Sequence, residues 1–243
     1  MPNPSQKYGE TVCCAGVTAE GKWKRLYPIR FRQLTSSKFN RWQWVDFKYR
    51  RATGDPRIES CHVFEDKISL GDVLKSDDEK ARFLNPLICT STAEAAARGE
   101  SLTLIRPIWA RFHYRKKPQA LIDAEREGYK QAAKQTLLLD KDLDALDPVP
   151  YAFGFHFQDG GGRHSHRCGD WETSATFWKM RKSKGEAAAL AHLSETYNEK
   201  YQAKGMVFAM GTVKARPKQW LLLGVIRLNE LTETQKCQTS FGF

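Results

Sequence analysis

Long hydrophobic runs and a secretory leader are both missing from this sequence. No stretch approaches the run of about 18 apolar residues that a membrane-spanning helix requires. The opening residues, Met1 to Lys7, contain no apolar segment of the kind that a signal peptide carries. We therefore expect a cytoplasmic protein that makes no membrane contact.

The sequence also lacks the short motifs of several enzyme classes. It contains no G-x-S-x-G nucleophile elbow, no G-x-x-x-x-G-K-[ST] phosphate loop and no G-x-G-x-x-G dinucleotide fingerprint. Its six cysteines include no C-x-x-C pair of the kind found in zinc ribbons and redox dithiols. In a reducing cytosol we expect them to serve as small apolar residues.

Positive charge, by contrast, is abundant and unevenly distributed. The first 57 residues hold twelve Lys and Arg but four Asp and Glu, a local excess of +8 out of a net charge of +11. Aromatic residues alternate with these cations at 22–27 and 41–51. Cations neutralise phosphates and aromatic faces stack on bases, so the pattern indicates a nucleic-acid partner. The alternative is that the rings belong to the core and the cations form a solvated rim.

The order of apolar and polar residues predicts an α+β fold. Two-residue periods are typical of strands, and we expect a twisted, mostly antiparallel sheet built from hairpins and flanked by helices. Capping residues and apolar stripes predict the helices, at 76–87, 91–99, 118–135, 170–183 and around 190–201.

Changes in composition along the chain suggest how it is divided. We expect a basic, strand-rich part with middle helices at 1–139, an acidic linker at 140–147, an α+β part at 148–228 and a polar tail at 229–243. The length also fits one compact domain overall.

The strand periods place cations and rings together on faces expected to stay wet. Along 42–51, Val45, Phe47 and Tyr49 would close a core while the alternate residues present two indoles beside two cations. A second strand, 102–115, carries cations and a ring on one side. The residues assigned to nucleic-acid binding are Lys22, Trp23, Lys24, Arg25, Arg30, Arg32, Arg41, Trp42, Trp44, Lys48, Arg50, Arg51, Arg111 and Arg115.

One segment has the residue types of a reaction centre. On a strand, His164, His166 and Cys168 share a face, and His156 lies within reach across a short hairpin. Imidazole and thiolate are ligands that zinc prefers, so His164, His166 and Cys168 form a candidate site for a divalent metal cofactor. The residues assigned to catalysis are Asp170 and Glu172, as carboxylates for a hard metal such as magnesium, and Lys179, as a cation for developing charge.

A structural explanation competes with that site. Asp170 stands where a helix N-cap belongs, and Glu172 is a first-turn acid that the helix dipole favours. These placements account for both carboxylates without a metal. Because Asn caps helices about as well as Asp, the substitution Asp170→Asn should be tolerated if Asp170 is only a cap.

Two stretches of the chain resemble a known family. The first is Glu10 to Gly16 followed by RLYPIRFR at 25–32, and the second is His164 followed by DWE at 170–172. Together they resemble an uncharacterised family of small prokaryotic proteins with this opening and this DWE segment, over residues 8–228. Relatives carry cysteines just before the histidine, where this chain has Phe and Gly. The resemblance implies a family and no activity.

The sequence thus favours a nucleic-acid-binding protein with a basic–aromatic sheet face. Stacking platforms on strands suit a single-stranded or distorted substrate better than base-specific duplex reading. One alternative is a metal-dependent nuclease or nucleic-acid-modifying enzyme centred on His164–Glu172. Another is an adaptor that binds an acidic protein partner.

If the basic segment is the binding surface, reversing Lys48, Arg50 and Arg51 to Glu should remove most binding without unfolding the chain. The logarithm of the parent's affinity should fall linearly with the logarithm of the salt concentration, because phosphate contacts release counterions. Titrating a fluorescent oligonucleotide at several salt concentrations measures both effects. A triple variant that binds as tightly as the parent would show that the site lies elsewhere.

Overall fold

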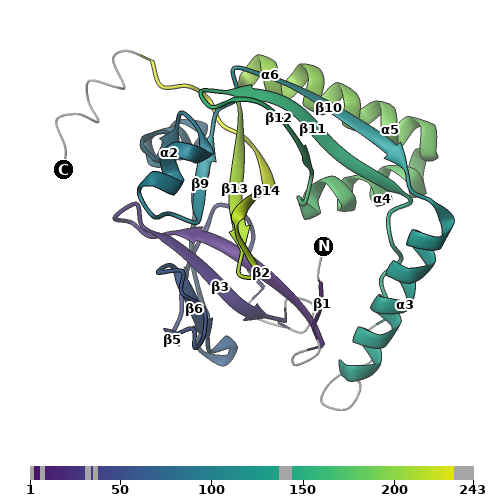
Figure 1. The fold of residues 1–243 in the computed structure, drawn as a ribbon, viewed down its shortest axis with the longest axis horizontal. Helices are drawn as coiled ribbons and strands as arrows, with labels where there is room; N and C mark the ends of the chain where they lie inside the picture. Colours follow the sequence, from purple (N-terminus) through teal and green to yellow (C-terminus); the bar gives the residue numbers. More distant parts are fainter. Residues whose placement is uncertain (1–2, 6–8, 31–33, 35–37, 137–143, 233–243) are drawn as a thin grey trace. The chain divides into compact units, whose positions relative to one another are not determined.

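The computed structural model describes residues 3–5, 9–30, 34, 38–136 and 144–232 (Figure 1). The chain forms two compact units that interleave along the sequence. Unit 1 comprises residues 1–73 and 115–152, and unit 2 comprises residues 74–114 and 153–243. Within the described ranges, none of the helices has the length and apolar character needed to span a bilayer. The expected linker and tail lie partly outside the described residues.

Unit 1 is organised around a five-stranded sheet in the order β1-β2-β3-β6-β5, in which β3 and β6 pair in parallel and the other neighbours antiparallel. A second sheet pairs β4 with β7, and helix α3 contacts β1 and β2. The elements are β1 (Asn3–Ser5), β2 (Gly9–Val17), β3 (Trp23–Ile29), β4 (Gln43–Asp46), β5 (Tyr49–Arg51), β6 (Ser60–Val63), a 3₁₀ turn (Glu65–Lys67), β7 (Ser69–Val73) and α3 (Gln119–Thr136).

Unit 2 contains a four-stranded sheet in the order β14-β13-β9-β8 and most of a three-stranded sheet in the order β10-β11-β12, in which the last two residues of β10 and the first two of β11 belong to unit 1. Helices α4, α5 and α6 run alongside the three-stranded sheet in Figure 1. The elements are α1 (Asp77–Leu84), a 3₁₀ turn (Asn85–Leu87), β8 (Ile88–Cys89), α2 (Thr92–Ala97), β9 (Leu102–Ile105), β10 (Trp109–Lys116), β11 (Tyr151–Asp159), β12 (Gly162–Arg167), α4 (Trp171–Lys184), α5 (Glu186–Glu195), a π-helical turn (Thr196–Lys200), α6 (Tyr201–Lys204), β13 (Met206–Val213) and β14 (Arg216–Arg227).

The fold class expected from the sequence is confirmed. The protein is α+β, its sheets are mostly antiparallel, and β2–β3, β11–β12 and β13–β14 are hairpins of consecutive strands. Helix starts follow the capping residues: Ser76 and Glu79 form a capping box at α1, Ser91 caps α2 and Asp170 caps α4. Helical ends differ from the expected ones by a few residues.

An aromatic cluster fills the core of unit 2. Phe153, Phe155 and Phe157 alternate along β11 and are buried, because successive side chains of a strand point to opposite faces. The Phe155 ring centroid lies 5.0 Å from that of Phe208 on β13 and 5.4 Å from that of Tyr197. Aromatic pairs of this kind contribute about 0.5–1.5 kcal/mol each beyond their burial. The other face of β11 is thereby left to small and polar residues.

The segment 42–51 is not the single strand that its period predicts. It divides into β4, which pairs with β7, and β5, which pairs with β6 in the other sheet. Trp42 precedes β4 in a turn, with a left-handed φ of 71°. Trp42 and Trp44 therefore do not share a strand face with Lys48 and Arg50, because the period is broken between the two sheets.

The prediction of one continuous strand over residues 102–115 is also wrong. Proline has no N–H to donate to a sheet, and Pro107 separates β9 from β10. The two strands then join different sheets of unit 2. The alternation expected within β10 is retained, since Ala110 and Phe112 are buried while Trp109 and Arg111 are exposed.

Candidate nucleic-acid interface

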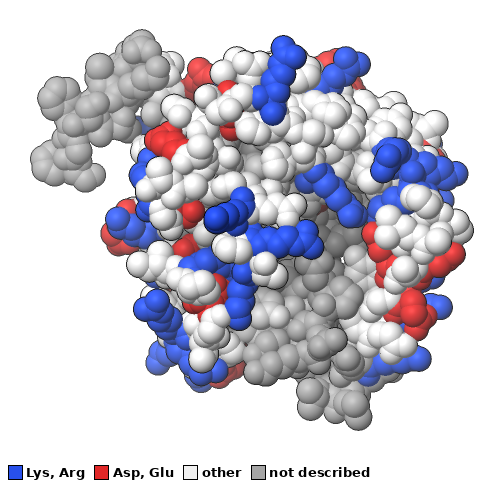
Figure 2. Space-filling view, viewed as in Figure 1, with Lys and Arg blue, Asp and Glu red and all other residues white. Residues whose placement is uncertain are grey.

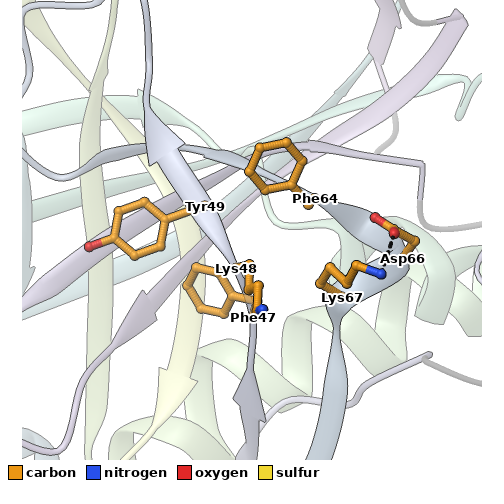
Figure 3. A pocket seen from close by; sticks show the side chains of 6 residues that line it. All are labelled: Phe47, Lys48, Tyr49, Phe64, Asp66 and Lys67. Carbon is orange, nitrogen blue, oxygen red and sulfur yellow. Dashed lines mark ion pairs between the residues drawn. The ribbon is translucent and has the colours of Figure 1, made fainter.

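The pairing of β5 with β6 forms one side of an open hollow in unit 1 (Figure 3). The N–H of Phe64 donates to the carbonyl of Lys48 at 3.0 Å, which carries the pairing one step beyond the strands. Beyond this bond the two segments diverge: one leads back to Phe47, and the other enters the 3₁₀ turn at Glu65–Lys67. The hollow has a volume of about 510 Å³ and is lined by Phe47, Lys48, Tyr49, Phe64, Asp66 and Lys67.

Three aromatic rings surround this hollow and keep accessible faces. Tyr49 is 46% exposed and Phe64 is 42% exposed, while Phe47 is half-buried. The ring centroids of Phe47 and Tyr49 lie 5.7 Å apart, and their planes are tilted by 47°. Figure 3 shows the rings placed around the opening. Exposed ring faces of this kind can stack on a planar ligand.

Cations flank the rings. The Lys24 ammonium donates to the Tyr49 hydroxyl at 3.1 Å and lies 5.0 Å from the ring centroid. That hydrogen bond raises the pKa of Lys24, so the ammonium stays charged at neutral pH. Lys67 forms an exposed ion pair with Asp66 at 3.1 Å, of the type that contributes about 0–1 kcal/mol. A phosphate could therefore displace Asp66 at little cost.

Further cations lie along the edge strand β5. Lys48, Arg50 and Arg51 are all exposed, and Figure 2 shows Lys and Arg side chains gathered over the region of β3, β5 and β6. Because side chains alternate along a strand, Arg51 shares the face of Tyr49 and Arg50 points to the other face. On that other face, Arg50 lies in one row with His62 of β6 and Tyr27 of β3.

The structure places several assigned nucleic-acid residues away from the hollow. Arg25 is buried beside Glu59 at 3.8 Å and cannot contact a ligand, which corrects its assignment. Arg30 pairs with Glu65 at 2.7 Å, and Arg32 lies outside the described residues. Trp44 belongs to the sheet of β4 and β7.

The remaining assigned residues differ in their exposure. Those with exposed side chains are Lys22, Arg41, Lys48, Arg50, Arg51, Arg111 and Arg115, and those with half-buried side chains are Trp23, Lys24, Trp42 and Trp44. Arg111 and Arg115 stand on β10 and not on the strands that line the hollow.

Of the six residues that line the hollow, sequence reasoning assigned Lys48 to binding and missed the other five: Phe47, Tyr49, Phe64, Asp66 and Lys67. The two-residue period assigned Phe47 to a core face together with Tyr49. Their rings are accessible because β4 leaves to pair with β7 just before them, which no local pattern shows. The polar turn Glu65–Lys67 directly after Phe64 is the one sequence signal that this strand ends at a surface.

The histidines of the β11–β12 hairpin are not gathered into a metal site. His164 Nε2 lies 2.8 Å from Asp159 Oδ1, which also accepts the N–H of Gly161 in the hairpin turn. Burial raises the pKa of the Cys168 thiol to about 12. Across the described part of the chain, no group of three or more His, Cys, Asp or Glu side chains could hold a metal ion.

His156 does not join the other hairpin histidines. The register pairs it with Ser165, whereas His164 and His166 lie opposite Phe157 and Phe155. Directly paired residues share a face, so His156 projects from the opposite side of the sheet. It stacks instead on His113 of β10, with ring centroids 4.2 Å apart.

The assigned catalytic carboxylates have structural positions. Asp170 is buried at the start of α4, where Oδ1 accepts the N–H of Glu172 at 2.9 Å. Its Oδ2 accepts the N–H of Val225 on β14 at 2.8 Å. Glu172 and Lys179 are exposed on α4. Asp170 therefore acts as a helix cap that also ties α4 to β14, and both of its oxygens are engaged by backbone donors.

Two family models match the chain. A Domain of unknown function (DUF8758) matches residues 1–86, and a second Domain of unknown function (DUF8757) matches residues 87–241. No curated protein and no solved structure matches the chain. The junction of the two matches falls inside unit 2, so the matched spans do not coincide with the two structural units.

The two bonds of Asp170 change the expected result of Asp170→Asn. Asn offers one acceptor oxygen to two N–H donors, and its amide group would face one of them. We expect the variant to lose about 1–3 kcal/mol of unfolding free energy, the cost of leaving a buried donor unsatisfied. Urea denaturation measures this loss, and Glu172→Gln is the control, with a change below about 1 kcal/mol. A variant that unfolds at the same urea concentration as the parent would contradict the hydrogen bond from the N–H of Val225 to Asp170.

Proposed function

The chain belongs to the DUF8757 family, and we propose that it is a nucleic-acid-binding protein that holds single-stranded or locally distorted strands at the hollow of unit 1. The cytoplasmic location and the prokaryotic origin that the sequence indicates are part of this proposal. No activity accompanies the family's description, so the proposal rests on the site itself.

One observation carries the proposal: accessible aromatic rings and flexible cations line the same open hollow. Ring stacking contributes about 1–3 kcal/mol per base when measured by alanine substitution, and it tolerates any base because every base has a π-face. The volume of about 510 Å³ lies within the range of about 300–1,000 Å³ typical of small-ligand sites. The hollow can therefore receive a base while the surrounding cations hold its phosphates.

The hollow favours strands whose bases are free. In a duplex, the faces of each base are covered by its neighbours in the stack, and extruding a base costs a few kcal/mol. Bases of single strands, mismatches and distorted sites are cheaper to present. In this proposal Lys24, which donates to the hydroxyl of Tyr49, and the exposed Lys48 and Arg51 contact the backbone of such a strand.

The two alternatives have less support. A metal-dependent nuclease at His164–Glu172 would need ligands that the described residues do not bring together. An adaptor for an acidic protein would use the cations of the hollow but would gain little from three accessible rings. The rings thus separate nucleic acid from an acidic protein, and they are the residues to test.

We expect the double variant Tyr49→Ala/Phe64→Ala to lose about 2–6 kcal/mol of affinity for an oligothymidine strand if each ring stacks on one base. The same variant should bind an abasic strand as the parent does, because that strand keeps the phosphates and lacks the bases. Fluorescence anisotropy with both probes at one salt concentration measures the two affinities.

Leu70→Ala is the matched control, since Leu70 is a 41% exposed apolar residue of unit 1 outside the hollow. Thermal melts check that each variant folds. Equal losses for the oligothymidine and the abasic strand would mean that the rings support the fold and do not stack on bases. An acidic peptide that binds as tightly as the oligothymidine would favour the adaptor.

A further inference from the structure

The three-stranded sheet of unit 2 has one face that carries cations and no carboxylate. We call it the arginine face. Its side chains are Trp109, Arg111 and His113 on β10, Gly154, His156 and Gln158 on β11, and Arg163, Ser165 and Arg167 on β12.

The register fixes the composition of this face. Gly154 pairs with Arg167 and Gln158 pairs with Arg163, and paired residues point the same way. His113 lies over Gly154, because a Cβ added there would come within 2.8 Å of the imidazole ring. The phenylalanines of β11 occupy the opposite face, where they are buried.

The arginine face is accessible and strongly positive. Arg111, Arg163, Arg167 and His156 are exposed, and Trp109 is 49% exposed. Among the residues that the structure describes, Arg111 and Arg163 make no ion pair. Asp159, the one acid of β11, is buried on the other face against His164. The described strand residues of this face therefore place no carboxylate beside Arg111 and Arg163.

We propose that the arginine face is a second nucleic-acid site, which binds the phosphates of a strand through Arg111, Arg163 and Arg167. A guanidinium presents a planar fork of donors that matches a phosphate bidentately. β10 and β12 are two strand spacings apart, about 10 Å, and the two arginines of β12 stand about 13 Å apart along the strand. The three guanidiniums can therefore contact separate phosphates of one backbone.

The rings of the face favour nucleic acid over an acidic peptide. Trp109 and the exposed His156 present ring faces beside the guanidiniums, which suits a ligand that carries phosphates and planar bases together. The inference does not depend on the hollow of unit 1. Either site can fail without the other.

His113, which stacks on His156, makes this site sensitive to pH. Burial, with a smaller contribution from His156, lowers the pKa of His113, and its buried Nε2 has no hydrogen-bond partner within the described residues. On the face of the pair, the charged groups of these strands are Arg111 and Arg115 on β10 and Arg163 and Arg167 on β12, all cations, while Asp159 of β11 lies on the other face. A bound phosphate favours the imidazolium, so affinity should rise as the pH falls below the ordinary pKa of histidine, about 6.5.

The double variant Arg111→Gln/Arg163→Gln tests the phosphate contacts. Log affinity falls as log salt rises, and for a single strand each lost contact should make this negative slope shallower by about 0.7, so that two lost contacts make it shallower by about 1.4. The oligothymidine and the abasic strand should lose affinity by the same factor. Arg82→Gln/Lys184→Gln removes the same charge from exposed helical positions of unit 2 and is the matched control.

Three results would overturn the inference. The first is an unchanged salt slope in the arginine variant, and the second is an equal loss of affinity in the control variant. The third is a polyglutamate peptide that binds the parent as tightly as the oligothymidine does and no longer binds the arginine variant. Tyr49→Ala/Phe64→Ala in the same titration keeps the two sites distinct, because only that variant should spare the abasic strand. If it changes nothing while the arginine variant weakens binding, the hollow fails and the arginine face stands.

The variant His113→Gln/His156→Gln tests the pH dependence. The parent should bind the abasic strand more tightly at about pH 5.5 than at about pH 7.5, and the variant should show little change between the two. Melting curves at both values check the fold, since the free protein loses stability below the ordinary histidine pKa when the unfolded chain takes up a proton that half-buried His113 resists. A parent that binds equally at both pH values, or a variant that keeps the dependence, would overturn the role of the pair.

Discussion

The burial of alternate phenylalanines along β11 is the constraint on which unit 2 depends. Each buried Phe side chain contributes roughly 1.5–3 kcal/mol relative to an exposed one. A register slip of one residue would turn Phe153, Phe155 and Phe157 outward together, so the pairing with β12 is strongly specified. That pairing in turn decides which residues of β12 face the helices and which face water. The arginine face is the other side of this aromatic core.

In unit 1 the strands β4 and β5 are short, and the rings of Tyr49 and Phe64 near them are accessible. β5 has three residues and lies at the edge of its sheet, where Arg50 and Arg51 also protect its unpaired backbone from joining another chain. β4 leaves that sheet to pair with β7, and the rings at the junction keep free faces around the hollow. In unit 1, the rings are accessible because the segment 42–51 divides between two sheets. In unit 2, the cations share one face because β11 and β12 pair continuously.

Local signals in the sequence predicted the helices well. Ser76, Ser91 and Asp170 cap helices as their types and spacings indicate, because a cap involves only a few neighbouring residues. The bond from Val225 to Asp170 joins residues far apart in the chain, and no spacing shows it. The same limit applies to His156. It stacks on His113 of the neighbouring strand β10, and the sequence does not show that these two strands are neighbours.

The sequence by itself determined the α+β class, the alternation along β10 and β11, the helix caps and the concentration of positive charge near the N-terminus. These properties depend on local periods, caps and composition. Only the tertiary structure decided that Arg25 is buried beside Glu59, that Phe47 and Phe64 line a hollow, and that Arg163 shares a face with Arg111. Such properties depend on which strands become neighbours. Strand pairing is set by burial summed over distant segments, and so no local window of the sequence contains it.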